Sequence, residues 1–162
     1  MARDGGKTGG GELLVCRNPK ATQRFEIEER LEAGMVLVGS EVKSLRQRRA
    51  DLEGAYASID GSELWLHGMH IAPYPQAGPH LQHEPKRRRK LLVHRHQIER
   101  LRGKLAVRGY TLVPVRVYFK GGRAKVELGL GKGKRLADRR EEIKRKQDLA
   151  EAREAVRRGK RR

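Results

Sequence analysis

The stretch from Lys120 to Arg140 most narrowly limits how this chain can fold, because it joins a hairpin-forming sequence to a basic segment. Gly121-Gly122 is typical of a tight β-turn, and the residues after it alternate in hydropathy through Leu128, as a half-buried strand does. From Gly129 to Lys134, glycine and lysine surround a single leucine. This run lacks the spacing of a phosphate-binding Walker loop, so it is predicted to be a flexible hinge. A folded domain is expected before it and a cationic tail after it.

The charge balance points to a polyanionic partner. The 162 residues carry 38 Lys/Arg against 20 Asp/Glu, a formal net charge of +18, and the apolar fraction is 36%. Such a chain can bury one modest core. The last 33 residues hold 14 basic and 6 acidic side chains, so the rest of the chain is basic as well. A domain this basic repels itself unless it meets a polyanion, and nucleic acid is the expected partner.

The sequence disfavours a membrane protein and a protein held together by disulfide bonds. No apolar run approaches the length that spans a bilayer, and no helix with a broad apolar face is visible. Cys16 is the only cysteine, which excludes an internal disulfide and favours the cytoplasm. Residues 1–12 are Gly-rich, lack the apolar core of a signal peptide and are predicted to be a disordered leader.

Short strands dominate residues 13–130. A strand beginning at Phe25 is predicted to turn at Glu32-Ala33-Gly34 into a second strand, and Asp60-Gly61 is the strongest hairpin signal. Tyr110 to Phe119 reads as a strand with Pro114 at an edge or bulge. Small helices are expected over 40–47 and 94–107, and a long loop rich in proline and histidine over 72–85.

About six short strands joined mostly by hairpins, without strand–helix–strand alternation, predict a mainly β fold with small helices. The expected architecture is an OB-like antiparallel β-barrel over residues 13–130, because this type of small barrel suits a basic, oligonucleotide-binding chain. The tail, residues 131–162, has capping-box spacing from Asp138 to Glu141. After Asp138 its only sizeable apolar side chains are Ile143, Leu149 and Val156. It is therefore predicted to be disordered alone and helical when bound to a polyanion.

Catalytic and metal chemistry have weak support. The six histidines occur in pairs without a CxxC, so no metal site is predicted. No acidic pair or nucleophile lies in a recognisable catalytic motif, so the chain is expected not to be an enzyme. With seven aromatic residues, a base-stacking platform is less favoured than recognition of a folded RNA by shape and backbone. Three basic clusters are expected to contact phosphates. The first is Lys86 to Lys90, which includes Arg89. The second is Lys43, Arg46, Arg48 and Arg49, and the third is Lys120, Arg123 and Lys125.

Several blocks together resemble the SmpB family of SsrA-binding proteins, in unbroken order over residues 13–146. They include Arg17-Asn18-Pro19-Lys20-Ala21, Leu31-Glu32-Ala33-Gly34, Gly39-Ser40-Glu41-Val42-Lys43-Ser44-Leu45-Arg46, Trp65-Leu66-His67-Gly68-Met69-His70-Ile71, Arg89-Lys90-Leu91-Leu92, Gly109-Tyr110-Thr111-Leu112-Val113-Pro114 and Gly122-Arg123-Ala124-Lys125-Val126-Glu127-Leu128-Gly129.

The resemblance implies an RNA-binding adaptor for trans-translation. Its barrel would hold the tRNA-like domain of transfer-messenger RNA (tmRNA, or SsrA RNA) and deliver it to stalled ribosomes, where the tail would occupy the empty mRNA channel and decoding centre. By analogy, Asn18, Glu32 and Leu92 match RNA-binding positions, and Lys20 lies in the same block as Asn18. The tail positions matched are Lys132, Lys134, Arg135, Asp138, Arg139 and Arg140. No cofactor is implied, and a monomer is expected.

Three residues depart from the family pattern. Pro19 replaces a basic residue, and so removes one phosphate contact. Arg139 replaces a lysine but preserves its charge. Ala137 stands where an aromatic or histidine side chain is usual, so a stacking role there is lost or moved. Two rival hypotheses use the same charge and barrel: a constitutive ribosomal protein or general RNA chaperone and, with less support, a metal-dependent nuclease.

Overall fold

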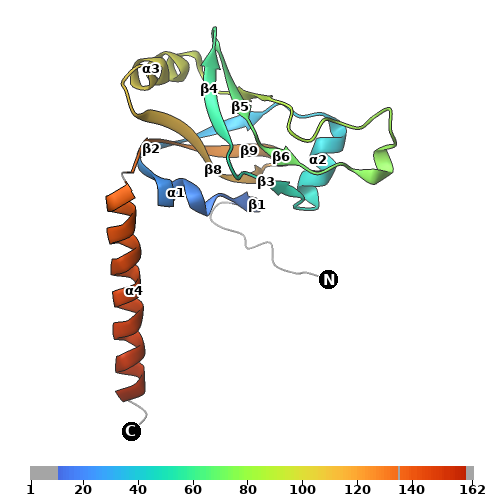
Figure 1. Cartoon of the computed structure of the whole chain (residues 1–162). Coiled ribbons are helices and arrows are strands. Elements are labelled where there is room, and N and C mark those ends of the chain that lie inside the picture. The colour runs from blue at the N-terminus through green and yellow to red at the C-terminus, as the bar shows by residue number, and fades with distance from the viewer. Residues whose placement is uncertain (1–10, 135, 160–162) are drawn as a thin grey trace.

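A computed structural model describes residues 11–134 and 136–159; the side chains of 136–141 lie outside that description. Strands dominate the chain up to Gly133, and one long helix follows (Figure 1). The elements in order are β1 (Glu12–Arg17), α1 (Pro19–Arg24), β2 (Phe25–Met35), α2 (Gly39–Arg46), β3 (Ala50–Asp51), β4 (Tyr56–Asp60), β5 (Glu63–His67), β6 (His70–Ile71), a 3-10 turn (Pro75–Ala77), β7 (Arg89–Leu92), α3 (Arg95–Leu105), β8 (Tyr110–Lys120), β9 (Arg123–Gly133) and α4 (Leu136–Gly159).

Six of these strands close into a ring. The main sheet has the order β1-β8-β4-β5-β7-β2-β9, and an additional β8–β9 pairing closes the ring, with β1 paired to the outer edge of β8. All the pairings are antiparallel. β4 meets β8 through the single pair Ala57–Leu112, so this seam is the shortest in the barrel. The predicted antiparallel barrel of about six strands with a C-terminal appendage is confirmed.

The predicted hairpin around Gly121-Gly122 is present as β8–β9, which is also the longest pairing. Its turn residues Gly121 and Gly122 both have positive φ, 58° and 76°, which side chains with a Cβ rarely adopt. The ladder shifts register between Pro114 and Arg116, the bulge expected for a proline inside a strand.

The predicted hinge from Gly129 to Lys134 is wrong, because β9 continues through it to Gly133 and pairs with both β2 and β8. Glycine is required here by close packing. A Cβ on Gly131 would lie 2.5 Å from the backbone oxygen of Glu26 on β2. The barrel therefore ends at Gly133, three residues beyond the predicted domain boundary.

The predicted turn at Glu32-Ala33-Gly34 is also wrong. β2 runs unbroken from Phe25 to Met35, pairing with β9 as far as Gly34 and with β7 at Gly34 and Met35. The strand thus bridges two neighbours and brings the outward residues of β7 and β9 together.

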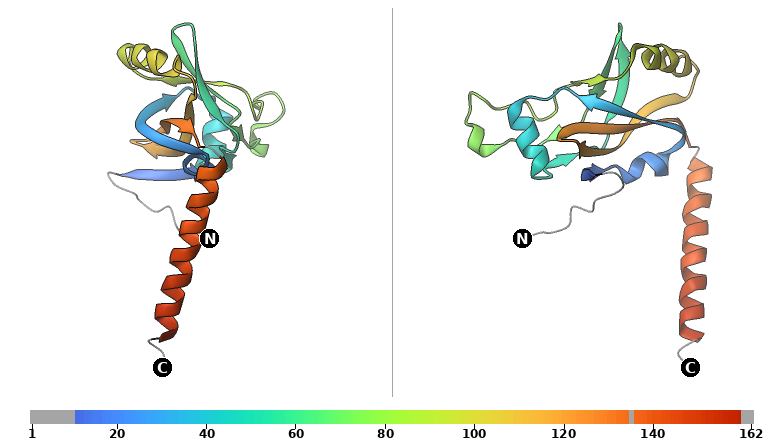
Figure 2. Two further views of the ribbon diagram at one scale, coloured as in Figure 1. Left: turned by 60° about the vertical axis from the view of Figure 1, so that its left-hand side comes forward. Right: turned by 180° about the vertical axis from the view of Figure 1, so that it is seen from behind.

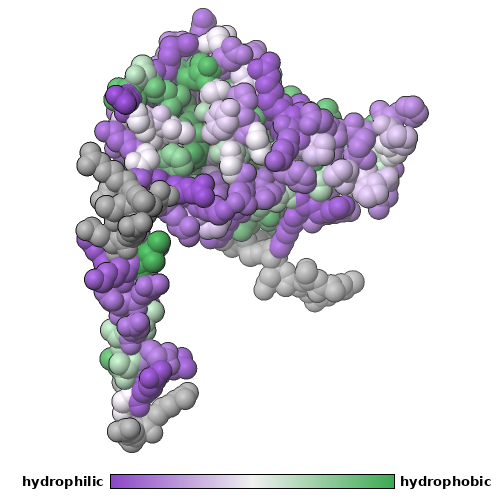
Figure 3. All heavy atoms as spheres, in the orientation of Figure 1, coloured by the Kyte–Doolittle hydropathy of each residue, from purple (hydrophilic) through white to green (hydrophobic). Residues whose placement is uncertain are grey.

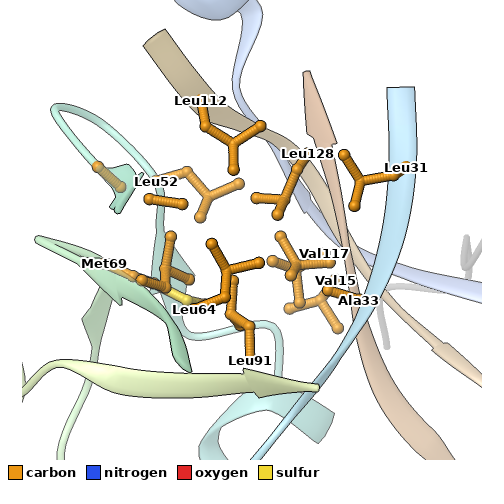
Figure 4. Close-up of a cluster of buried hydrophobic side chains, with 14 of the residues drawn as sticks. Val15, Leu31, Ala33, Leu52, Leu64, Met69, Leu91, Leu112, Val117 and Leu128 are labelled. Atoms are coloured by element: carbon orange, nitrogen blue, oxygen red, sulfur yellow. The ribbon is translucent and has the colours of Figure 1, made fainter. Parts of the chain in front are cut away.

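Inward-facing aliphatic side chains fill the barrel. Leu52, Leu64, Leu112, Val117 and Leu128 are fully buried and converge from four segments of the chain (Figure 4). Burying one such side chain stabilises the fold by about 1.5–3 kcal/mol. The helix α3 adds Ile98 and Leu101 to the buried set.

The proline- and histidine-rich loop is attached to α2. His83 is buried, with Nδ1 2.8 Å from Ser40 Oγ and Nε2 2.9 Å from the backbone oxygen of Ile71. Ser44 donates a hydrogen bond to the backbone oxygen of Ala72 at 2.7 Å. The loop therefore has a fixed path over one end of the barrel.

The tail is a single helix, α4, which leaves the barrel beside α1 and projects away from it (Figures 1 and 2). Its large apolar side chains, Ile143, Leu149 and Val156, are all more than half exposed. The visible face of the molecule is largely hydrophilic, with isolated apolar patches (Figure 3). The tail is helical in the structure of the chain by itself. That binding to a polyanion stabilises this helix stays a prediction. No helix within the described residues is long and apolar enough to cross a membrane.

Candidate RNA-binding surface

Strand register gathers several predicted RNA-binding residues on the outer face of β2, β7, β8 and β9. Gly34 on β2 is opposite Leu92 on β7 and Lys125 on β9, and Lys125 is also opposite Tyr118 on β8. Glu32 lies two residues before Gly34 and so shares its face. We call this set, Glu32, Leu92, Tyr118, Lys120 and Lys125, the barrel face; Tyr118 supports it from below, because this residue is only 1% exposed.

Glu32 is held as a carboxylate. The Tyr118 hydroxyl donates a hydrogen bond to it, and Lys120 Nζ lies 3.5 Å from its Oε2. The Tyr118 hydrogen bond, aided by the charges of Lys120 and Lys125, lowers the pKa of Glu32 below its ordinary value. Burial and contact with Glu32 raise the pKa of Tyr118, which therefore remains a neutral donor. The carboxylate keeps lone pairs that can accept from a ribose hydroxyl or a base amino group.

Leu92 belongs to the surface. It is 54% exposed, whereas its neighbour Leu91 is buried in the core. A Cβ on Gly34 would lie 3.4 Å from Leu92 Cβ, so the glycine leaves one side of the leucine uncovered. An apolar side chain close to Lys125 suits contact with a sugar or base as well as with phosphate.

Asn18 lies at the edge of a groove that continues the barrel face. Its Nδ2 donates to the Pro114 oxygen at 3.0 Å and its backbone nitrogen to the Val115 oxygen at 2.8 Å, which fixes the start of α1 on β8. The following Pro19 occupies the first turn of α1, where its missing donor costs nothing. This structural use accounts for the proline that departs from the family pattern.

The groove has a volume of about 830 Å³ and is open to solvent. Three arginines line it. Arg116 is paired with Glu12 at 2.8 Å and Glu127 at 3.1 Å and lies 4.2 Å from the Tyr118 ring centre, so it links the groove to the barrel face. The other two, Arg17 and Arg30, are exposed.

The remaining predicted cations are spread more widely. Lys43 and Arg46 on α2 lie over the rings of Tyr74 and Phe119, at 5.4 Å and 4.8 Å. Phe119 is buried on the opposite face of β8 from Lys120, so its contact with Arg46 does not place Arg46 on the barrel face.

Two lysines are held in exposed ion pairs. Lys20 pairs with Glu53, and Lys90 with Glu63 at 3.0 Å. Such surface pairs exchange readily for a phosphate, because each is worth about 0–1 kcal/mol. Arg123 is exposed beside the β8–β9 turn.

Arg89 is corrected from an RNA contact to a structural residue. Its side chain is fully buried, and its Nε lies 2.5 Å from Glu41 Oε2. Its other nitrogens donate to the backbone oxygens of Met69 and Pro85 at 2.5 Å and 3.0 Å. A guanidinium in this position cannot reach a phosphate. Arg87 also binds Glu41 and so shares the cluster.

Four side chains of this surface were missed from the sequence: Tyr118, Arg116, Arg30 and Arg17. For two of them a signal existed, because period-two alternation on β8 places Arg116, Tyr118 and Lys120 on one face. The bulge after Pro114 precedes this stretch and does not disturb it.

The predicted tail residues are described in part. Lys132, at the end of β9, lies 4.8 Å from the Tyr110 ring centre, and Lys134 bonds Glu142 on α4 at 2.6 Å. Arg135 lies outside the described residues. Asp138, Arg139 and Arg140, like Ala137, lie in α4, but their side chains are outside the description.

The described residues contain no group of three or more His, Cys, Asp or Glu side chains that could hold a metal ion. The arrangement offers cations, one carboxylate and exposed apolar surface on a rigid sheet.

Comparison with known proteins identifies the family of this chain. The family model described as SmpB protein matches residues 15–158. An SsrA-binding protein of Geobacter sulfurreducens is 53% identical over 147 residues, covering 91% of this chain and 95% of the relative. One from Desulforudis audaxviator is 50% identical over 97% of this chain and 98% of the relative.

A solved chain from work on tmRNA–SmpB in the bacterial ribosome is 45% identical. It has a TM-score of 0.63 and covers 75% of this chain and 85% of its own length. The family model matches the sequence from β1 into α4, and relatives about half identical cover nearly the whole chain. The chain therefore belongs to the SmpB family.

Proposed function

We propose that this protein binds the tRNA-like domain of tmRNA through the barrel face. The observation that carries the proposal is the register that brings Glu32, Leu92 and Lys125 together from three strands. A rigid sheet with separated cations and one acceptor suits recognition of a folded RNA by its backbone and 2′-hydroxyls. Relatives about half identical to this chain are named SsrA-binding proteins, after the same RNA.

The second part of the proposed role is delivery of this RNA to stalled ribosomes, with the tail acting in the empty mRNA channel and decoding centre. α4 has 24 residues, so it extends about 36 Å from its start. Its exposed surface is rich in cations, which suits a channel lined by ribosomal RNA. The protein would act as a non-enzymatic, monomeric adaptor in the cytoplasm, where ribosomes translate.

Truncation separates the two tasks. A chain ending after Arg135 keeps all nine strands, whereas a cut after Gly131 would remove the end of β9. We expect the truncated protein to bind tmRNA within about twofold of the full chain, since each of its barrel contacts is retained. Tagging of peptides on stalled ribosomes in a reconstituted translation system should be lost.

Equal loss of RNA binding and tagging would contradict this division of labour. A ribosomal protein or general RNA chaperone would instead be present in stoichiometric amounts on all ribosomes. Quantifying the protein on translating and on stalled ribosomes separates these possibilities, because an adaptor is enriched on the stalled ones.

A further inference from the structure

Lys134 occupies the junction between the barrel and the tail helix. Its backbone nitrogen donates to the Arg24 oxygen at the end of α1, at 2.7 Å. Its Nζ donates to the Thr22 oxygen at 3.0 Å and to the two Glu142 oxygens at 2.7 Å and 2.6 Å. One side chain thus ties α1, the end of β9 and the second turn of α4 together.

The environment of Lys134 differs from that of a solvated tail lysine. Its side chain is only 13% exposed, whereas Glu142 is 43% exposed. Among the described residues, Glu142 is the one acidic side chain within ion-pair distance of it. An ammonium group this covered needs its partner, because a poorly solvated charge without one is costly.

The end of β9 at Gly133 locates the point after which α4 can turn. Gly131 is packed against the β2 backbone, where it admits no side chain. A Cβ on Gly133 would meet no atom within 4 Å. Gly133 still pairs with Phe25 on β2, so the strand ladder holds the chain up to Gly133 and α4 can change direction only after it. Beyond that point, the contacts of Lys134 hold α4 in the direction shown in Figure 2.

We propose that Lys134 and Glu142 form a joint that sets the direction of α4 relative to the barrel. Lys134 is then a positioning residue for the tail, acting through Glu142, in place of the direct ribosome contact that its basic character first indicated. A tilt of about 15° at the base would move the far end of a helix about 36 Å long by about 9 Å. A loose joint would therefore misdirect the whole tail. This inference rests on the proposed function for its biological meaning, but not for its geometry.

The test is a charge exchange. The variants Lys134→Glu and Glu142→Lys each break the pair, and the double variant restores it with reversed polarity. The distance between spin labels on Glu99→Cys, an exposed position of α3 outside the proposed RNA-binding surface, and Gln147→Cys is measured by pulsed electron resonance, with Cys16→Ala as background. Affinity for tmRNA and tagging on stalled ribosomes are measured on the same proteins.

We expect one narrow distance distribution for the parent protein, which broadens in both single variants and narrows again in the double variant. Tagging should fall at least fivefold in the single variants and recover to within about threefold in the double variant. RNA affinity should change less than twofold throughout. Recovery is incomplete because the new carboxylate cannot donate to the Thr22 oxygen.

The matched control exchanges Glu154 and Arg158, an exposed pair on α4 at 3.8 Å. It reverses the same charges in the tail but should leave the distance distribution unchanged, even in its single variants. Single variants at Lys134 and Glu142 that keep the narrow distribution would overturn the joint. Restored geometry without restored tagging would overturn the positioning role, because the ammonium itself would then be required. If the parent protein neither binds tmRNA nor supports tagging, the proposed function fails, while the distances still decide the joint.

Discussion

Replacing Glu41 by glutamine removes the carboxylate that balances two guanidinium groups at the end of the barrel. The Glu41 and Arg89 side chains have no exposed surface, and Arg87 is 31% exposed. Breaking a buried pair by neutralising one partner costs about 3–5 kcal/mol, because the remaining charge stays buried. Since small domains have total stabilities of about 5–15 kcal/mol, this single change should remove a large fraction of the total.

The same site makes a prediction about pH. Burial alone would raise the pKa of Glu41, but hydrogen bonds from Arg87 and the Val38 N–H, with the charge of Arg89, lower it below its ordinary value. The folded protein therefore binds fewer protons here than the unfolded chain does. The stabilisation is complete above the unfolded pKa of about 4.3 and is lost as pH falls through the lower, folded pKa. The glutamine variant should lack this component of the acid dependence.

Urea unfolding at neutral pH, followed by Trp65 fluorescence and circular dichroism, measures the effect. With a urea m-value of about 2 kcal/mol/M, a loss of 3–5 kcal/mol lowers the midpoint by about 1.5–2.5 M. The control is Glu53→Gln, since Glu53 is 60% exposed and pairs with the exposed Lys20, and it should change stability by less than about 1 kcal/mol. If Glu41→Gln matched this control, the assignment of Glu41 as the carboxylate that holds the cluster would be refuted.

Three further changes test the barrel face and the strand that supports it. The double variant Lys120→Ala, Lys125→Ala should weaken tmRNA binding and reduce the slope of log affinity against log salt by about 1.5–2, as expected for two lost phosphate contacts. An unchanged slope in a filter-binding assay would exclude both lysines from the interface. Tyr118→Phe removes the hydroxyl that donates to Glu32, and the pKa of Glu32 should therefore rise toward its ordinary value in an NMR titration. A constant pKa would show that the charges of the lysines, not this hydrogen bond, keep it low. Gly131→Ala should destabilise the barrel by about 1–3 kcal/mol through overpacking, whereas Gly133→Ala, with open space around it, should be close to neutral in thermal unfolding.

Hydropathy alternation and turn chemistry were sufficient to predict the barrel, and the exceptions have physical causes. Glu32-Ala33-Gly34 resembles a turn because it combines a charge, a small residue and a glycine. In the structure, Gly34 instead lies inside a long strand, with a flanking leucine and lysine packed close to its Cα. A single sequence does not distinguish a glycine that allows a turn from a glycine that leaves room for a closely packed neighbouring side chain.

The same ambiguity explains the missed end of β9. The glycine–lysine pattern around Gly129 and Gly131 is typical of a hinge, yet a Cβ at either position would collide with β2, through the Ile27 side chain or the Glu26 backbone. The collision depends on which strand lies opposite, and that is a property of the closed ring. Barrel closure pairs residues about a hundred positions apart, which local sequence patterns do not encode.

The inward position of Arg89 can be predicted from the alternation of residues along β7. Once Leu91 is placed in the core, period-two alternation also places Arg89 on the inward side of β7, although it lies within a run of five cations. An inward arginine needs a carboxylate, and Glu41 supplies it from the short helix α2. The basic run therefore divides by parity: Arg87 and Arg89 bind Glu41 and anchor the fold, whereas Arg88 and Lys90 lie at the surface in ion pairs that a phosphate can replace. By the same physical reasoning Lys134, the most covered of the tail lysines predicted to contact the ribosome, is the one to which we assign a positioning role.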